Sequence, residues 1–377
     1  MSGPAGPAPM PVPFGDFAAH LRPIRAEIDR ALARVLDSGW FILGPEGEAF
    51  ERELAAAMAA PDAVAVANGT EAIQLALEAS GVGAGHEVVT SPLTAAFTAL
   101  AVIRCGARPV FADVDPATLN VSAASVRSVI TPRTKALLPV HLYGHPVDLD
   151  PLLELARERR LLVIEDACQA HGACYRGRTV GALSGLGALS FYPTKNLGAL
   201  GDGGAILVQD PELAARLRRL RNGGQTDRYR HVEAGINSRL DEMQAAILRV
   251  KLAHLAEWTA RRRALAELYL RELASAAIRL PQEQPYARAA YHLFVIRHPR
   301  RDALMAALKQ RGIGSLIHYP IPLHLQPAFA GLGPCVGGLP VAEAAAGEIL
   351  SLPLYPEMTD DQARAVAAAV RELAPRV

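Results

Sequence analysis

The sequence predicts an α/β fold, in which a large domain is built on a mostly parallel sheet and a smaller α+β domain follows it. Two patterns carry this prediction. Between residues 63 and 208, short and wholly apolar segments alternate with helical patterns, which is typical of parallel strands covered by helices on both faces. From residue 241 to about residue 274 the chain has helical apolar spacing without proline or glycine, so one long helix leads out of the sheet domain.

The chain of 377 residues is long enough for two or three domains. We expect a large domain over residues 14–245 and a small C-terminal domain over residues 246–377. Residues 1–13 are rich in proline, glycine and alanine and have neither the charged nor the apolar region of a signal peptide. They are expected to form a disordered tail.

Charge and cysteine usage exclude several classes of protein. The 39 Lys+Arg and 38 Asp+Glu residues leave a net charge of +1, too little cationic excess for a nucleic-acid groove. The longest nearly uncharged stretch, residues 91–103, is shorter than the roughly 20 residues of a membrane helix. The four cysteines have no CxxC spacing, which fits a reducing cytoplasm. We therefore expect a cytoplasmic protein that binds neither nucleic acid nor membranes.

The elements follow in a regular order. Helical spacing between residues 17 and 58, broken at Gly44-Pro45, predicts two helices. The expected strands are residues 63–67, 87–90, 109–113, 136–140, 161–166, 188–191 and 204–208. The helices expected between them are residues 71–78, 94–105, 123–130 and 151–159. In the small domain we expect a strand at residues 291–296, helices at 301–311 and 360–373, and a proline-rich loop at 318–327.

The residues with most chemical content lie between residues 163 and 208. Asp166 ends a strand, and parallel sheets place ligand-binding groups at the carboxyl ends of their strands. Lys195 is a single lysine among small and apolar residues, so its neutral amine is favoured and it is a candidate Schiff-base former. An aspartate such as Asp166 can pair with a protonated pyridine nitrogen.

A phosphate-binding turn completes this set. Asn68-Gly69-Thr70 lies between a strand and a helix, where backbone N–H groups and a hydroxyl can hold an anion. Ser190 can add a second hydroxyl. Lysine, aspartate and phosphate cradle together predict pyridoxal 5'-phosphate (PLP) as the cofactor.

Several long motifs at these positions resemble the DegT/DnrJ/EryC1/StrS family of sugar aminotransferases. The similarity extends from about residue 17 to the C-terminus. It rests on Asn68-Gly-Thr70, the runs 163–172, 190–198 and 201–204, and Asn237-Ser-Arg-Leu-Asp241. The resemblance implies the aspartate aminotransferase-like architecture of PLP-dependent transferases, fold type I. It also implies a homodimer whose active sites are shared between the subunits.

The resemblance assigns roles by motif position. Lys195 would bond covalently to the cofactor, and Asp166 would pair with its pyridine nitrogen. Asn237 would reach the phosphate bound by the partner chain. The remaining cofactor contacts would come from Gly69, Thr70, Gln169 and Ser190.

The resemblance also narrows the substrate. It implies glutamate as amino donor, a nucleoside-diphosphate keto-deoxysugar as acceptor, and ping-pong kinetics in deoxyamino-sugar biosynthesis. Residues 237–252 and 317–324 are most similar to members acting on dTDP-3-keto-6-deoxyhexoses. A 4-keto sugar nucleotide, a cyclitol substrate and a non-catalytic regulatory role stay open. Substrate contacts are expected from His318, Tyr319 and Arg239, for which loop packing or a structural ion pair is an equal alternative.

One position departs from the pattern of the family. Many relatives have an aromatic residue stacking on the pyridine ring where this chain has Ala95, so either Phe97 replaces it or a smaller group packs there.

His141 and His145 have the spacing of a metal pair on a helix, but the surrounding Pro139, Gly144 and Pro146 disfavour a helix. We expect no metal site.

Overall fold

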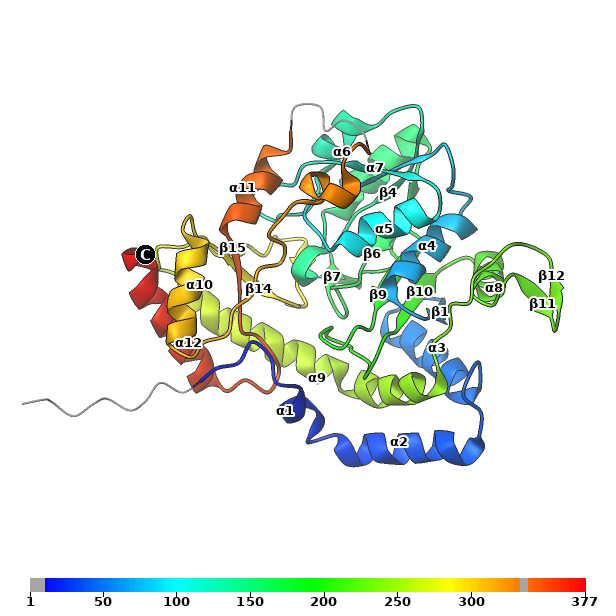
Figure 1. Ribbon diagram of the computed structural model, residues 1–377, viewed down its shortest axis with the longest axis horizontal. Helices are drawn as coiled ribbons and strands as arrows, with labels where there is room; N and C mark the ends of the chain where they lie inside the picture. Colours follow the sequence, from blue (N-terminus) through cyan, green and yellow to red (C-terminus); the bar gives the residue numbers. More distant parts are fainter. Residues whose placement is uncertain (1–10, 333–337) are drawn as a thin grey trace, which may run out of the picture.

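The computed structural model describes residues 11–332 and 338–377, and its centre is a twisted sheet (Figure 1). One half of the sheet has the order β3-β2-β4-β5 and the other the order β1-β10-β9-β6. The strands are β1 (Asp62–Val66), β2 (Glu87–Thr90), β3 (Arg108–Phe111), β4 (Thr134–Leu138), β5 (Leu162–Val163), β6 (Glu165–Asp166), β9 (Leu186–Ser190) and β10 (Gly204–Val208).

The two halves form one surface because β5 and β6 are consecutive parts of the single strand predicted at residues 161–166. Ile164 N donates to Leu137 O at 3.0 Å between them, and Val140 pairs with Asp166 beyond β4. Neighbouring strands are parallel except around β10, which is antiparallel to both β1 and β9. The predicted α/β fold with a mostly parallel sheet is confirmed.

Helices cover both faces of this sheet, which explains why its strands are apolar throughout. Along β2, Val88 packs into the core beside α4 and α5, whereas Val89 packs into the core beside α7. Successive side chains of a strand point to opposite faces, so each face needs its own apolar residues. The helices of these layers are α4 (Gly69–Ala79), α5 (Ala96–Arg104), α6 (Ala123–Val129), α7 (Leu149–Arg159) and α8 (Pro211–Leu220).

The predicted long helix is α9 (Glu242–Glu272), which runs beneath the sheet in Figure 1 beside α2. Its early residues Leu248 and Leu255 belong to the sheet core, whereas Leu265 and Leu268 belong to the C-terminal core. The division predicted at residue 245 thus falls inside a continuous helix, and the packing changes only further along it. The N-terminal helices are α1 (Phe17–Leu21), α2 (Arg25–Ser38) and α3 (Pro45–Ala57).

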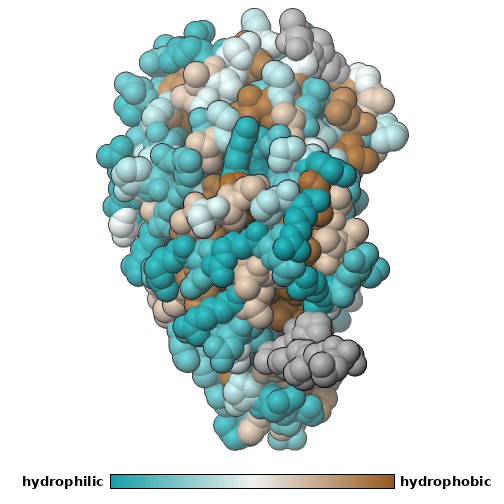
Figure 2. All heavy atoms as spheres, turned by 90° about the vertical axis from the view of Figure 1, so that its left-hand side faces the viewer, coloured by the Kyte–Doolittle hydropathy of each residue, from teal (hydrophilic) through white to brown (hydrophobic). Residues whose placement is uncertain are grey.

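The C-terminal part combines a two-stranded antiparallel sheet with three helices. β14 (Phe294–Arg297) pairs with β15 (Ile349–Leu352). The helices are α10 (Arg301–Gln310), α11 (Pro340–Glu348) and α12 (Asp360–Leu373), of which α10 and α12 coincide with predicted helices. On the side of α10 and α12, the surface in Figure 2 is mostly hydrophilic.

Shorter elements complete the chain. The strands β11 (Gln225–Asp227) and β12 (Arg230–His231) form a hairpin that extends away from the sheet (Figure 1). The other short elements are β7 (Cys174–Tyr175), β8 (Arg178–Thr179), β13 (Ala287–Arg288), η1 (Leu142–Gly144), η2 (Leu323–Leu325), η3 (Pro327–Phe329) and η4 (Ala374–Arg376).

The disordered tail predicted for residues 1–13 is wrong at its C-terminal end. Residues 1–10 lie outside the described residues. Val12, however, is fully buried in the C-terminal core and pairs with Ile313, and its N–H donates to Gly312 O at 3.0 Å. The folded part therefore includes residues before 14, because one apolar side chain anchors them. Among the helices described, none has the length and apolar character to cross a membrane.

Candidate active site

Three parallel strands place the predicted residues at one edge of the sheet. Asp166 ends β6, Ser190 ends β9, and Gly69 follows the end of β1 by three residues. Because these strands run in the same direction, their carboxyl ends lie at the same edge, where α/β proteins bind ligands. The sheet thus brings together residues that are far apart in the sequence.

Asp166 is held firmly at this edge. Its side chain is 3% exposed, its Oδ2 accepts from Thr98 Oγ1 at 2.8 Å, and its Oδ1 accepts from Cys168 N at 3.2 Å. Both donors fix the orientation of the carboxylate while leaving lone pairs for a further partner. The carboxylate is therefore oriented for one charged ligand group.

Lys195 stands on a tight loop between β9 and β10. The N–H of Lys195 donates to Tyr192 O at 2.8 Å, and Ala199 N donates to Phe191 O at 2.7 Å, which closes the loop. Burial lowers the pKa of the Lys195 amine, and the charges of Cys168 and Asp166 oppose this shift. The direction of this shift is the one expected for a lysine that acts as a nucleophile.

Three histidines surround this lysine. Burial, and next the charge of Lys195, lowers the pKa of His171 to about 3 and that of His318 to about 4. The same two causes hold the pKa of His292 well below its ordinary value. His171 is fully buried, and neither of its ring nitrogens has a hydrogen-bond partner among the described residues. The lysine therefore has neutral imidazoles around it at neutral pH.

The phosphate cradle predicted at Asn68-Gly69-Thr70 is the N-terminus of α4. Asn68 is the N-cap, and its side chain accepts from Glu71 N at 2.9 Å, while Gly69 and Thr70 follow it as the first two residues of the helix, where backbone amides have no partner within the helix. A Cβ atom at Gly69 would lie 2.7 Å from Ser190 Cβ, so only glycine fits against Ser190. Amides and a hydroxyl thus meet where a phosphate group fits.

Gln169 links this edge to the late proline-rich loop. Its Oε1 accepts from Tyr143 N at 2.7 Å, and its Nε2 donates to the hydroxyl of Tyr319 at 2.9 Å. The hydroxyl of Tyr143 donates to the carbonyl of His318. His318 and Tyr319, predicted as substrate contacts, therefore lie at the site, and burial raises the pKa of the Tyr319 hydroxyl to about 12.

Two predicted residues have other surroundings within this chain. Asn237 is exposed and pairs through its backbone with Asn222. Arg239 donates to Asn222 Oδ1 at 3.1 Å. The structure of one chain does not bring either residue to Lys195.

Neither Ala95 nor Phe97 supplies an aromatic side chain to the site. Ala95 is the half-buried N-cap of α5. Phe97 is 62% exposed, and the next residue, Thr98, is the one that contacts Asp166. Because neighbouring helix residues differ by about 100° in direction, Phe97 points away from the face that carries Thr98. Within one chain, Phe97 therefore does not take the place of the missing stacking residue.

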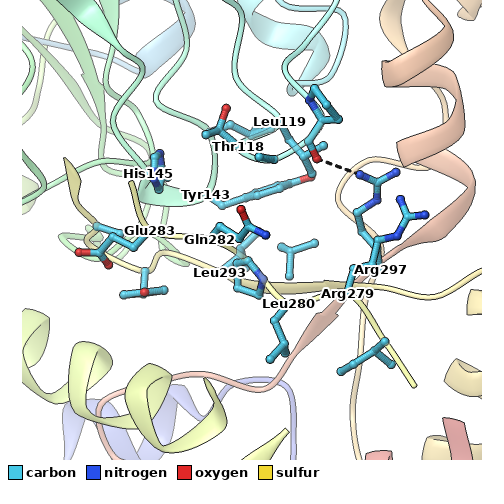
Figure 3. A pocket seen from close by; sticks show the side chains of 18 residues that line it. Thr118, Leu119, Tyr143, His145, Arg279, Leu280, Gln282, Glu283, Leu293 and Arg297 are labelled. Carbon is cyan, nitrogen blue, oxygen red and sulfur yellow. Dashed lines mark hydrogen bonds between the residues drawn. The ribbon is translucent and has the colours of Figure 1, made fainter. Parts of the chain in front are cut away.

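A separate cavity of about 310 Å³ has Tyr143 in its lining (Figure 3). Its walls are mostly apolar, and two of its basic side chains contact other parts of the chain. Arg297 donates to Pro116 O at 3.1 Å and to Glu348 Oε2 at 3.0 Å, and the His145 ring contacts Pro146 O at 2.8 Å. Lys195 and Asp166 are absent from its lining, so it is distinct from the site above.

His141 has a structural role. Its Nε2 donates to Glu165 Oε2 at 3.1 Å and its Nδ1 accepts from Val147 N at 3.0 Å, with both side chains fully buried. His145 follows on the one-turn 3₁₀ segment η1, whose Tyr143 has φ 58°, so no α-helix aligns the two imidazoles. Within residues 11–332 and 338–377, no three His, Cys, Asp or Glu side chains are grouped to hold a metal ion.

Sequence reasoning missed Thr98 and Tyr143. Thr98 lay within a predicted helix, and its place next to Asp166 depends on how α5 packs. Tyr143 contributes through its backbone N–H, which no side-chain pattern can indicate. The Gly144 beside it was a signal, since a Cβ there would lie 2.9 Å from His292 N.

A lysine and an aspartate at the carboxyl edge of such a sheet, beside a phosphate cradle, define the class of fold type I PLP-dependent enzymes. The chain belongs to the DegT/DnrJ/EryC1/StrS aminotransferase family, whose sequence pattern matches residues 22–371. The chain is 52% identical to a dTDP-3-amino-3,4,6-trideoxy-alpha-D-glucose transaminase of Streptomyces venezuelae over 97% of both chains. The predicted family and the aminotransferase activity are confirmed.

Solved structures agree with this assignment. The S. venezuelae protein DesV, solved in complex with a ketimine intermediate, superposes with a TM-score of 0.95 at 52% identity, covering 97% of this chain and 99% of its own. NtdA from Bacillus subtilis, solved with bound cofactor PMP, has a TM-score of 0.90 at 30% identity, covering 98% and 87%.

Proposed function

We propose that this aminotransferase moves an amino group from glutamate to C3 of a dTDP-linked 3-keto-6-deoxyhexose, with PLP bound through Lys195. The observation that carries the proposal is the meeting of Lys195, Asp166 and the Gly69–Ser190 cradle at one edge of the sheet. The S. venezuelae relative named for a 3-amino sugar supports the choice of C3.

The residues of the site match each part of the cofactor. The α4 amides at Gly69 and Thr70 and the Ser190 hydroxyl would hold the phosphate, and the buried Asp166 carboxylate would face the pyridine nitrogen. Gln169 would line the ring's other edge. PLP, when bound, supplies an electron sink for the bonds at the amino-bearing carbon.

The chain's own residues then bind, orient and move protons. Burial lowers the pKa of the Lys195 amine, so this amine is the group that would accept a proton from the substrate carbon and return it. Thr98 holds the Asp166 carboxylate in one orientation, in which it would pair with the pyridine nitrogen. Tyr319 is fixed by Gln169, and His318 beside it hydrogen-bonds Ser351 Oγ at 2.9 Å. These two residues would orient the sugar.

We further propose a homodimer that shares its active sites. Large apolar side chains are exposed around the start of α9, where Glu242 N donates to Phe41 O and Leu200 N donates to Gln244 Oε1. The exposed apolar residues there are Trp40, Phe41, Ile42 and Leu200. A patch of this kind marks an association surface, and Asn237 and Arg239 lie next to it in sequence. A second subunit on this surface would let Asn237 reach the partner's phosphate.

A half-reaction tests the substrate. Purified protein converted to the pyridoxamine form with glutamate is mixed with a 3-keto or a 4-keto dTDP-6-deoxyhexose. We expect the 3-keto sugar to restore the PLP absorption band and the 4-keto sugar to leave it unchanged. Restoration by the 4-keto sugar alone would move the site of amination to C4.

We also propose that the protein is cytoplasmic. The thiols of Cys105, Cys168 and Cys174 are free, which suits the reducing cytoplasm predicted from the sequence.

A further inference from the structure

Lys251 is a buried lysine that the site described above does not use. It lies on α9 between Leu248 and Leu255, which both pack into the sheet core, and it is only 2% exposed. At this position of the helix an apolar side chain would normally face the core. Burying an ammonium group there is costly, so its contact has to be examined.

The amine of Lys251 donates to the backbone carbonyl of Gly198. Burial lowers the pKa of this amine to about 8, and the charge of Glu357 opposes the shift. Glu357 itself pairs with His20 at 2.7 Å. The direct partner of the buried amine is thus a carbonyl of the loop that carries Lys195.

That loop is tightly folded around Gly198. A Cβ at Gly198 would lie 2.3 Å from Pro193 O, so the two arms of the loop touch at this point. The hydrogen bond from Ala199 N to Phe191 O closes its base. The residue directly after Lys195 is also anchored, because Asn196 Nδ2 donates to Ala290 O at 3.0 Å. Asn196 and Lys251 therefore both hold the short segment that follows Lys195.

We propose that Lys251 is a positioning residue, whose bond to Gly198 O sets the loop so that the Lys195 amine meets the cofactor carbonyl. This inference rests on the proposed role of Lys195 as the cofactor-binding lysine. A catalytic amine displaced by about 1 Å can lose two orders of magnitude in rate, so a single anchoring bond has a measurable effect. Because burial of the ammonium group costs free energy that offsets the bond, we expect the bond to matter more for the geometry of the loop than for stability.

The test compares three variants with the wild type. Lys251→Met keeps the side-chain length and removes the donor, Lys251→Arg keeps a cationic donor, and Lys309→Met removes an exposed lysine on α10 as a control. Apoprotein is mixed with PLP, the rate of covalent attachment is followed by absorbance, and the attachment site is mapped after borohydride reduction. The thermal unfolding midpoint of each apoprotein, kcat and KM are also measured.

We expect Lys251→Met to slow attachment and lower kcat about tenfold, with KM for the sugar nucleotide unchanged. Its unfolding midpoint should equal or exceed that of the wild type, since an apolar residue replaces a buried charge. Lys251→Arg should recover part of the rate, and Lys309→Met should match the wild type.

Two results would overturn the inference. One is attachment at the wild-type rate in Lys251→Met. The other is slow attachment accompanied by a lower unfolding midpoint and no recovery in Lys251→Arg, which would indicate a purely structural role. Failure of the wild-type protein to attach PLP at Lys195 would instead refute the proposed function itself.

Discussion

Asp166 shows how single residues are prepared for their task in this site. The sequence indicated its place at the end of a strand and hence its direction toward a pocket. It did not indicate Thr98, whose hydroxyl orients the carboxylate at 2.8 Å. That contact joins residues 68 positions apart and depends on the packing of α5 against the sheet. Strand ends can be recognised in a sequence, whereas the partners supplied by neighbouring elements cannot.

We predict that Asp166→Asn will bind PLP but lose activity by about 100-fold or more. An amide cannot keep the pyridine nitrogen protonated, so the cofactor becomes a poor electron sink. Absorbance titration with PLP and steady-state transamination measure the two effects separately. Thr98→Val, which removes only the orienting donor, should show a smaller loss in the same direction. Near-normal turnover in Asp166→Asn would refute the assigned role.

Glu165 precedes Asp166 on β6 and points to the other face of the sheet. Burial alone would raise the pKa of the Glu165 carboxyl, but hydrogen bonds from His141, Ser184 and Gly181 outweigh it and hold the pKa below 4.5. A carboxyl with a depressed folded pKa stabilises the protein fully above its unfolded pKa. This contribution is lost as the pH falls below 4.5 through the folded value.

Accordingly, Glu165→Gln should cost about 3 kcal/mol of unfolding free energy at neutral pH. The difference from the wild type should shrink as the pH is lowered through the range in which the native carboxyl protonates. Urea unfolding of the apoprotein at several pH values provides the measurement. A difference that stays constant with pH would show that the charge of Glu165 is not what stabilises the fold.

At the scale of elements, the long helix α9 was the easiest to predict and α11 and β15 were missed. Residues 242–272 lack proline and glycine, so the helical period is uninterrupted. The alanine-rich α11 passes directly into β15 at Ile349, so no loop separates the helical period from the strand period. The short strands β7, β8 and β13 pair only two residues each, too few to show a pattern.

The first residue of α9, Glu242, also caps the N-terminus of α3. The N-cap of α3, Gly44, has no side chain, and the Glu242 carboxylate accepts instead from Gly44 N, Glu46 N and Gly47 N at 2.7–2.9 Å. Glu242→Ala should therefore cost about 2–4 kcal/mol, because three amides at a helix N-terminus lose a charged acceptor.

The Glu242 prediction is tested by urea unfolding of the apoprotein. Glu242→Gln keeps one acceptor oxygen and should cost less than Glu242→Ala. Gly47→Ala offers an independent check, because its Cβ would lie 2.7 Å from Glu242 Oε1 and should also destabilise the protein. Unchanged stability in Glu242→Ala would show that water replaces the carboxylate without loss.

At the scale of the whole molecule, the near-neutral net charge of +1 fits a protein that binds anions locally. The proposed phosphate cradle would consist of amides at the start of α4 and nearby hydroxyls, and it would need no broad cationic surface. Domain boundaries were less accessible to sequence reasoning. The change of core occurs within α9, and a helix that serves two cores carries no boundary signal in its sequence.

We predict that the protein in solution has the mass of two chains and that Phe41→Glu dissociates it. A charge in the exposed apolar patch at the start of α9 would oppose its burial against a second subunit. Light scattering after size exclusion measures the mass, and activity should fall with it because Asn237 would no longer reach a partner. Ala365→Glu, on the exposed side of α12, is the matched control. A monomeric, active wild-type protein would contradict the shared site.

Mapping the lysine that bonds covalently to the cofactor tests the proposed function most directly. Wild-type protein loaded with PLP is reduced with borohydride, digested, and the modified peptide identified by mass. We predict that Lys195 alone carries the reduced cofactor and that Lys195→Ala protein carries none. A modified lysine elsewhere, or no modification of the wild-type protein, would contradict the central claim.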